Sequence, residues 1–159
     1  MQAKPSPLKC LGYFLTELAL NANPQHDVAK PIKLDFKDLH VESSVETVPA
    51  NQGKPLWRVV LRIQQNVGPD KNSPYNFAAV LLGHFQVHPK YPADQAQQLV
   101  EINGSSILYS AVRQILRDAM NNGPFHPLVL PTVSFAEQAP APQANKVAEA
   151  QADYGEKHR

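Results

Sequence analysis

Two histidines of this chain have the spacing of a metal-binding pair. His84 and His88 are four residues apart, which places two side chains on one face of a helix. The residues around them alternate between apolar and polar and predict a strand, in which four residues span about 13 Å. One zinc ion cannot bridge that distance, because its bonds to nitrogen are about 2 Å long. We therefore interpret the histidines as structural and expect no metal site.

No other pattern in the sequence predicts catalysis. It contains no glycine-rich phosphate loop, no Gly-x-Ser-x-Gly turn and no His-Glu-x-x-His motif. The carboxylates are scattered singly, and we expect Glu42 and Glu46 to lie in a solvated loop. Cys10 is the only cysteine, so an internal disulfide or a thiolate metal site is excluded. We expect neither an enzyme nor a bound cofactor.

Composition narrows the class of protein further. The 159 residues carry 15 Lys and Arg against 14 Asp and Glu, a formal net charge of +1, without the basic excess typical of nucleic-acid binders. No apolar run reaches the ~18 residues of a membrane span. The segment Met1 to Lys9 is polar and lacks the order of a secretory signal. We expect one cytoplasmic domain over residues 8–135, followed by a disordered tail rich in Ala, Gln and Pro over residues 136–159.

Alternating apolar residues predict four strands. They cover residues 8–20, 32–41, 56–67 and 75–88. The first also fits a helical period. The second changes phase near Asp38, which predicts a bulge or break there. Short turns between the strands favour an antiparallel sheet with one buried face.

The last third of the chain predicts helix. Residues 93–102 could form a short helix, and residues 105–122 carry a broad apolar stripe with Ser105 or Ser106 as its cap. We expect Gly123 in a left-handed conformation and Pro124 to end this helix. The fold class is therefore α+β, a four-stranded antiparallel sheet packed on a long C-terminal helix. The apolar faces exceed what one subunit can bury, which indicates association or ligand grooves.

Five segments of the chain resemble the SecB family of protein-export chaperones. Residues 107–113, Ile-Leu-Tyr-Ser-Ala-Val-Arg, are similar to that family's Ile-Leu-Phe-Pro-Tyr-Ala-Arg helix start. Residues 122–135, which include Gly-Pro-Phe-His-Pro-Leu, resemble the family's Gly-Thr-Phe-Pro-x-Leu ending. Residues 56–62 and 77–85 resemble its second and third strands, and residues 32–36 match in place. The resemblance covers roughly residues 11–135 in the same order of elements.

This resemblance implies a homotetramer, a dimer of dimers, that holds unfolded polypeptides in hydrophobic grooves without ATP. It places Ile32, Leu34, Phe36 and Trp57 in the client-binding groove. It places Phe77, Ala79, Leu81, Tyr109, Val112 and Leu116 at the interface between subunits.

The same resemblance locates a face that docks the translocase ATPase at Glu17, Asn21, Asn76 and Ala78. Only Glu17 keeps a carboxylate there, so binding of the translocase is left open. Two other functions also stay open. The protein could be the dedicated chaperone of a single partner, such as an antitoxin, or an oligomeric adaptor subunit that keeps the fold without holdase activity.

Overall fold

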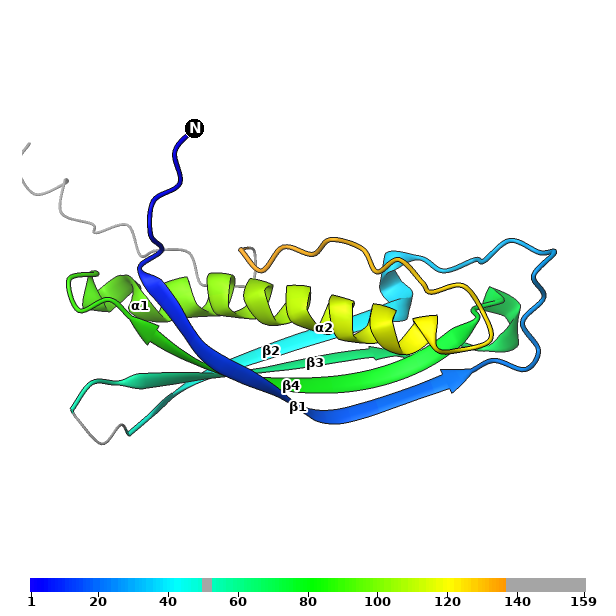
Figure 1. The fold of residues 1–159 in the computed structure, drawn as a ribbon, viewed down its shortest axis with the longest axis horizontal. Helices are drawn as coiled ribbons and strands as arrows, with labels where there is room; N and C mark the ends of the chain where they lie inside the picture. Colours follow the sequence, from blue (N-terminus) through cyan, green and yellow to red (C-terminus); the bar gives the residue numbers. More distant parts are fainter. Residues whose placement is uncertain (50–52, 137–159) are drawn as a thin grey trace, which may run out of the picture.

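The computed structural model describes residues 1–49 and 53–136 as one sheet with helices on one face (Figure 1). The strands are β1 (Leu8–Ala22), β2 (Leu39–Val48), β3 (Leu56–Gln65) and β4 (Tyr75–Val87). The helices are α1 (Ala93–Leu99) and α2 (Ser105–Asn121). The predicted α+β fold class is confirmed. Apart from Ala136, the predicted tail over residues 136–159 lies outside the described residues.

All neighbouring strands are antiparallel, in the order β1-β4-β3-β2. β1 and β2 are therefore the two edges of the sheet. β1 forms a strand and not the alternative helix, and its 15 residues are interrupted by register shifts between Cys10 and Gly12 and between Leu15 and Glu17. Shifts of this kind are β-bulges, which bend and twist an edge strand.

The buried face of the sheet and the apolar stripe of α2 pack together in one hydrophobic core. The odd-numbered residues of β3 and β4 face α2, among them Val59, Leu61 and Phe85, and none of these three exposes any side chain to solvent. From α2 they meet Leu108, Val112, Leu116 and Met120, also fully buried. These positions follow the 3.6-residue period, which is why one helix covers the middle of the sheet.

The predicted strand over residues 32–41 is wrong in its first half. The chain forms a 3-10 turn at Phe36–Asp38, and β2 begins only at Leu39. The Asp35 carboxylate accepts a hydrogen bond from the Lys37 N–H at 2.7 Å, while the Asp38 carboxylate accepts one from the Asp35 N–H at 2.9 Å. This reciprocal cap stabilises the turn and overrides the local alternation. Glu42 and Glu46 lie on β2, not in a loop as predicted.

The two predicted helices are joined, which corrects the predicted serine cap. α1 continues through a π turn at Val100–Gly104 directly into α2, so Ser105 and Ser106 do not cap a helix start. The Ser105 hydroxyl is buried and shares a hydrogen bond with Ser43 on β2. A Cβ at Gly104 would lie 3.1 Å from Val59, so glycine lets the helix approach the sheet closely here.

After α2 an extended segment, residues 124–136, runs back along the helix (Figure 1). Gly123 at the turn does not adopt the predicted left-handed conformation; a Cβ there would collide with the Tyr75 hydroxyl. The segment is anchored by the Tyr109 hydroxyl, which donates to the Pro131 carbonyl at 2.6 Å, and by the buried ring of Phe135. Within the described part of the chain, no helix is long and apolar enough to cross a membrane.

Candidate functional site

Exposed apolar side chains gather on β1. We define the β1 surface as Leu11, Tyr13, Phe14, Leu15 and Leu18, each of which exposes more than a third of its area. Leu15 and Leu18 pair with Leu81 and Ala79, so they point to the same side of the sheet as α2. Phe14 pairs with Leu82 and points to the opposite side. β1 therefore exposes apolar side chains on both faces of the sheet edge, which is typical of strands that bind a partner.

A second apolar region lies on the loop that joins β1 to β2. This crossover loop, residues 23–38, exposes Ile32 by 45% and Phe36 by 61%, while Leu34 is half-buried. The three predicted groove residues are therefore neighbours with accessible side chains. Their contact with a client stays a prediction.

Asn72 holds the crossover loop against the turn before β4. Its side-chain oxygen accepts a hydrogen bond from the Asp27 N–H at 2.9 Å, and its amide nitrogen donates to the carbonyls of Asp27 and Lys30 at 3.0 Å. Asn72 itself has a left-handed backbone, with φ at 50°, a conformation that Asn adopts more readily than most residues. The amide therefore fixes the loop that carries Ile32 and Phe36.

Ion pairs reinforce the same junction. The Lys71 ammonium lies 3.1 Å from the Asp38 carboxylate and 4.0 Å from Asp35. The hydrogen bond from the Asp35 N–H and the pairing with Lys71 lower the pKa of Asp38 below its ordinary 3.8. The hydrogen bond to Asp38 raises the pKa of Lys71 above 10.5. Both groups are therefore charged at neutral pH.

The fourth predicted groove residue, Trp57, lies far from the other three. It pairs with Thr47 near the end of β2, whereas the crossover loop enters β2 at Leu39. Eight strand residues separate the two positions, about 27 Å. The resemblance placed Trp57 and Phe36 in one groove, but within this chain they belong to two separate surfaces.

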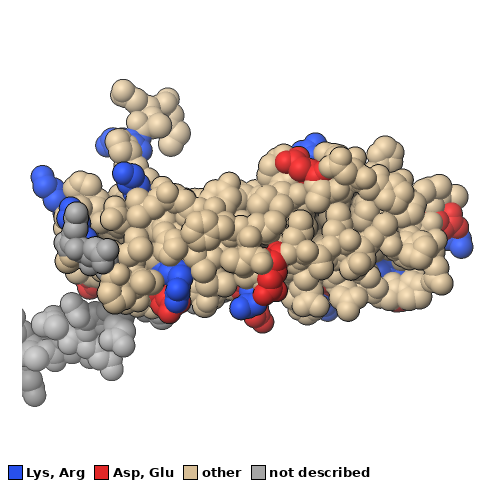
Figure 2. All heavy atoms as spheres, turned by 60° about the horizontal axis from the view of Figure 1, so that its bottom comes forward, with Lys and Arg blue, Asp and Glu red and all other residues tan. Residues whose placement is uncertain are grey.

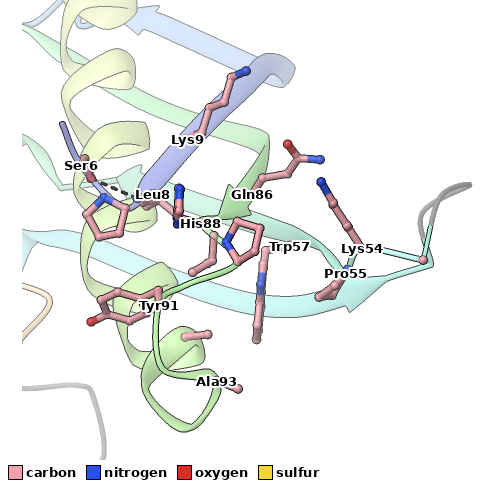
Figure 3. A pocket seen from close by; sticks show the side chains of 15 residues that line it. Ser6, Leu8, Lys9, Lys54, Pro55, Trp57, Gln86, His88, Tyr91 and Ala93 are labelled. Carbon is pink, nitrogen blue, oxygen red and sulfur yellow. Dashed lines mark hydrogen bonds between the residues drawn. The ribbon is translucent and has the colours of Figure 1, made fainter.

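Trp57 lines a cavity at its own end of the sheet (Figure 3). We call this cavity of about 710 Å³ the end pocket. Three segments distant in sequence form it: residues 6–9, residues 53–57 and residues 86–96. Apolar side chains dominate its walls, namely Pro7, Leu8, Pro55, Trp57, Val87 and Tyr91. The sequence analysis did not predict this pocket. The sequence contains its aromatic and proline residues, but they are spread over three segments, and no local pattern indicates that these segments meet.

The six residues predicted to form the interface between subunits lie in the core of this chain. Each exposes at most 3% of its surface, so none offers a free surface to a second copy. They are Phe77, Ala79 and Leu81 on β4 and Tyr109, Val112 and Leu116 on α2. Their role between subunits stays a prediction.

The four residues predicted to dock the translocase share the face of the sheet opposite α2. Asn21 pairs directly with Asn76, Ala78 lies next along β4, and Glu17 pairs with Val80. The Asn76 side chain is engaged, because it exchanges two hydrogen bonds with the backbone of Val67. The structure brings the four together, and their docking role stays a prediction.

Ionisable groups do not converge on a reaction centre in residues 1–49 and 53–136. No three His, Cys, Asp or Glu side chains of these residues come close enough to hold a metal ion. Burial raises the pKa of the Tyr109 phenol, with a smaller opposing effect from Arg113. That phenol donates a structural hydrogen bond and lies under the Arg113 guanidinium.

Comparison with known proteins shows the family to which this chain belongs. Residues 12–140 match the family model described as preprotein translocase subunit SecB. The chain belongs to the SecB family. A SecB protein-export protein of Zymomonas mobilis is 31% identical over 98 residues, which span 62% of this chain and 58% of that protein. One from Xanthobacter autotrophicus is 28% identical over 135 residues, 84% of this chain and 83% of that protein.

Solved structures share the SecB-like fold at low sequence identity. A SecB-like chaperone of Mycobacterium tuberculosis, in complex with a peptide from the HigA1 antitoxin, has a TM-score of 0.51 and 13% identity. The similarity covers 80% of this chain and 88% of that one. A Streptococcus agalactiae protein of unknown function has a TM-score of 0.50 and 12% identity, covering 79% of this chain and 97% of its own. At these identities the likeness is one of fold.

Proposed function

We propose that this SecB-family protein is an ATP-independent holdase chaperone that binds unfolded polypeptides in the cytoplasm. The observation that carries the proposal is the exposed apolar side chains on two ordered elements, the β1 surface and the crossover loop. An unfolded client offers aliphatic and aromatic side chains to such surfaces. Burying them gains about 25 cal/mol per Å² and demands no particular client sequence.

Assembly into a homotetramer, as a dimer of dimers, is part of this proposal. β1 is an edge strand whose outer backbone groups have no partner strand within the described chain, and its apolar side chains are exposed. An edge of this kind is a template for pairing with a second copy. Several weak client-binding surfaces on one assembly would raise the overall affinity through effective concentration.

Protein export is the process that the family suggests for the held clients. A client kept unfolded can be passed to a translocase, and the face with Glu17, Asn21, Asn76 and Ala78 is the proposed contact for the translocase ATPase. That face carries one carboxylate among the four residues, so electrostatic docking there would be weak. Co-sedimentation of the protein with a purified translocase ATPase, with and without Glu17→Lys, tests this step.

The holdase proposal is tested by aggregation of a denatured model client in the presence of the protein without nucleotide. Light scattering should fall as the protein approaches one tetramer per client. Phe36→Asp should weaken this protection and leave the circular dichroism spectrum unchanged, because the side chain is exposed and in no core contact. Ile107→Asp is the matched control, since Ile107 is an exposed apolar residue of α2, outside the β1 surface and the crossover loop. No protection across several clients would overturn the proposal.

A second function is favoured by the Mycobacterium tuberculosis relative, whose structure contains an antitoxin peptide. This protein would then be the dedicated chaperone of a single partner with an aggregation-prone segment. Such a chaperone binds its partner far more tightly than denatured model clients. Isothermal titration of both kinds of ligand distinguishes the two functions, and similar affinities would rule against a dedicated partner.

A further inference from the structure

The end pocket is a preformed cavity that the apolar surfaces of β1 and the crossover loop do not include. Its volume of about 710 Å³ lies within the ~300–1,000 Å³ typical of pockets that enclose small ligands. Trp57 and Tyr91 supply aromatic walls, and Pro7 and Pro55 supply rigid ones. The pocket therefore suits one or two large apolar side chains held out from an extended chain.

Lysines give this pocket a positive rim. The lining residues include Lys9 and Lys54 but no Asp or Glu. Figure 3 shows both lysines toward one side of the cavity, away from Trp57 and Tyr91. Neither lysine forms an ion pair with another of the residues 1–49 and 53–136. Both ammonium groups are therefore available to a ligand.

The nearby carboxylates do not neutralise this rim. Glu46, close to Trp57 along the β2–β3 pair, is engaged by Arg58, with its carboxylate 2.6 Å from the Arg58 Nε. Asp94 lies exposed in the first turn of α1 and does not line the cavity. Figure 2 shows Lys and Arg side chains gathered at the end from which the N-terminal segment projects. The local charge is thus positive although the whole chain carries only +1.

A second cavity has the same sign of charge. A groove of about 320 Å³ between α2 and the C-terminal extended segment is lined by Arg113, Arg117, Leu128 and Val129. It too contains no carboxylate in its lining. Two cavities formed by different elements therefore combine apolar walls with Lys or Arg side chains that form no ion pair with the described residues.

We propose that the end pocket selects client segments in which a large apolar side chain is flanked by Asp or Glu. The apolar side chain would pack against Trp57, and the flanking carboxylates would pair with Lys9 and Lys54. This inference rests on the proposed holdase function and adds a charge preference to it. A single exposed ion pair contributes little, so the preference should be about three- to tenfold in affinity at low salt.

Trp57 provides a direct readout, because it is the only tryptophan of the chain. Two tryptophan-free peptides with one apolar core are titrated, one flanked by Asp and Glu and one by Lys. The acidic peptide should change Trp57 emission at about three- to tenfold lower concentration, and the difference should disappear at 0.5 M salt. Equal midpoints for the two peptides at low salt would overturn the proposal.

Charge-reversal variants locate the preference. Lys9→Glu combined with Lys54→Glu should reverse it toward the lysine-flanked peptide. Arg62→Glu combined with Lys4→Glu makes the same change in net charge at residues that do not line the end pocket, and should leave the preference unchanged. The proposal fails if the preference for the acidic peptide persists in the end-pocket variant, or if the control variant removes it equally. Either result would mean that the overall charge of the protein, and not the end pocket, determines which peptide binds.

The holdase assay separates failure of this inference from failure of the proposed function. If denatured clients are protected but Trp57 responds equally to both peptides, the holdase function stands and the charge preference falls. If no client is protected but Trp57 still distinguishes the peptides through Lys9 and Lys54, the end pocket is a selective peptide site and the holdase proposal falls.

Discussion

The phenol of Tyr75 forms two hydrogen bonds with the backbone of Phe125, 50 residues away in sequence. The hydroxyl donates to the Phe125 carbonyl at 2.7 Å and accepts from the Phe125 N–H at 2.9 Å. One buried side chain at the start of β4 thereby anchors the segment that follows α2. The ring of Phe125 in turn packs edge-on against His26 of the crossover loop, with centroids 4.8 Å apart. Tyr75 therefore couples the C-terminal segment to the loop that carries Ile32 and Phe36.

Tyr75→Phe should destabilise the fold by about 1–3 kcal/mol, since it leaves both backbone groups of Phe125 without their partner. Urea denaturation followed by circular dichroism measures this free energy of unfolding. Tyr13→Phe is the matched control, because the Tyr13 hydroxyl forms no hydrogen bond with the described part of the chain and its ring is exposed. Equal stability of the two variants would show that the Phe125 contact contributes nothing.

Asn72 should control the order of the crossover loop. Asn72→Gly keeps the left-handed backbone but removes the amide, so the Asp27 N–H loses its acceptor and the Lys30 carbonyl its donor. We expect a loss of about 1–3 kcal/mol in stability and faster hydrogen exchange at Asp27 and its neighbours.

A second substitution at the same position separates the amide from the backbone. Asn72→Ala removes the same hydrogen bonds and adds the strain of a left-handed backbone, about 1–2 kcal/mol further. Similar stability of the Gly and Ala variants would mean that backbone strain is absent. Unchanged exchange at Asp27 in both variants would mean that the amide does not hold the loop.

The Asp38–Lys71 pair predicts that this loop loosens in acid. The folded-state pKa of Asp38 is lowered, so its carboxylate contributes stability above pH 3.8, and that contribution is lost as the pH falls through the lowered pKa. Lys71 stays charged throughout this range, because its pKa is raised. The stability difference between wild type and Asp38→Asn should therefore shrink between about pH 5 and pH 2.

Denaturation of both proteins across that range measures the effect. Asp70→Asn is the control, because the Asp70 carboxylate forms no ion pair with the described residues. A difference between wild type and Asp38→Asn that stays constant down to pH 2 would assign the effect of Asp38 to packing and not to charge.

The regular parts of this fold were readable from the sequence because local and tertiary preferences agree in them. Alternation in β3 matches a strand that buries Val59 and Leu61, and the apolar stripe of α2 matches a helix that covers them. Residues 32–36 alternate equally well, yet the Asp35–Asp38 cap turns the chain there. Asp35 and Asp38 have the three-residue spacing of a capping box, which indicates a turn, but the alternating apolar residues favoured a strand.

The sites were less predictable, because they are assembled from distant segments. Ile32, Leu34 and Phe36 are close in sequence, and the structure keeps them together on one loop. Trp57 was grouped with them through a resemblance, whereas the chain path puts it about 27 Å away along the β2–β3 pair. The end pocket joins residues 6–9 to residues 86–96, a meeting that no local pattern specifies.

The β1 surface offers the sharpest test of assembly. The Leu18 side chain is 43% exposed on an edge strand. Because it buries little area within its own subunit, it contributes little to the stability of the isolated subunit. If copies associate through β1, Leu18→Arg places a charge in the contact, where desolvation without a partner is costly. Light scattering after size-exclusion chromatography should then show a mass below four times the 17.6 kDa of one chain, with an unchanged circular dichroism spectrum.

Val129→Arg is the control for this variant, because Val129 is the most exposed apolar residue after Met1 and lies on the C-terminal segment, away from β1. It should keep the wild-type mass. Dissociation by Val129→Arg but not by Leu18→Arg would move the contact from β1 to the C-terminal segment. Client protection should fall together with the mass, since separated subunits lose the gain in affinity that several linked binding surfaces provide.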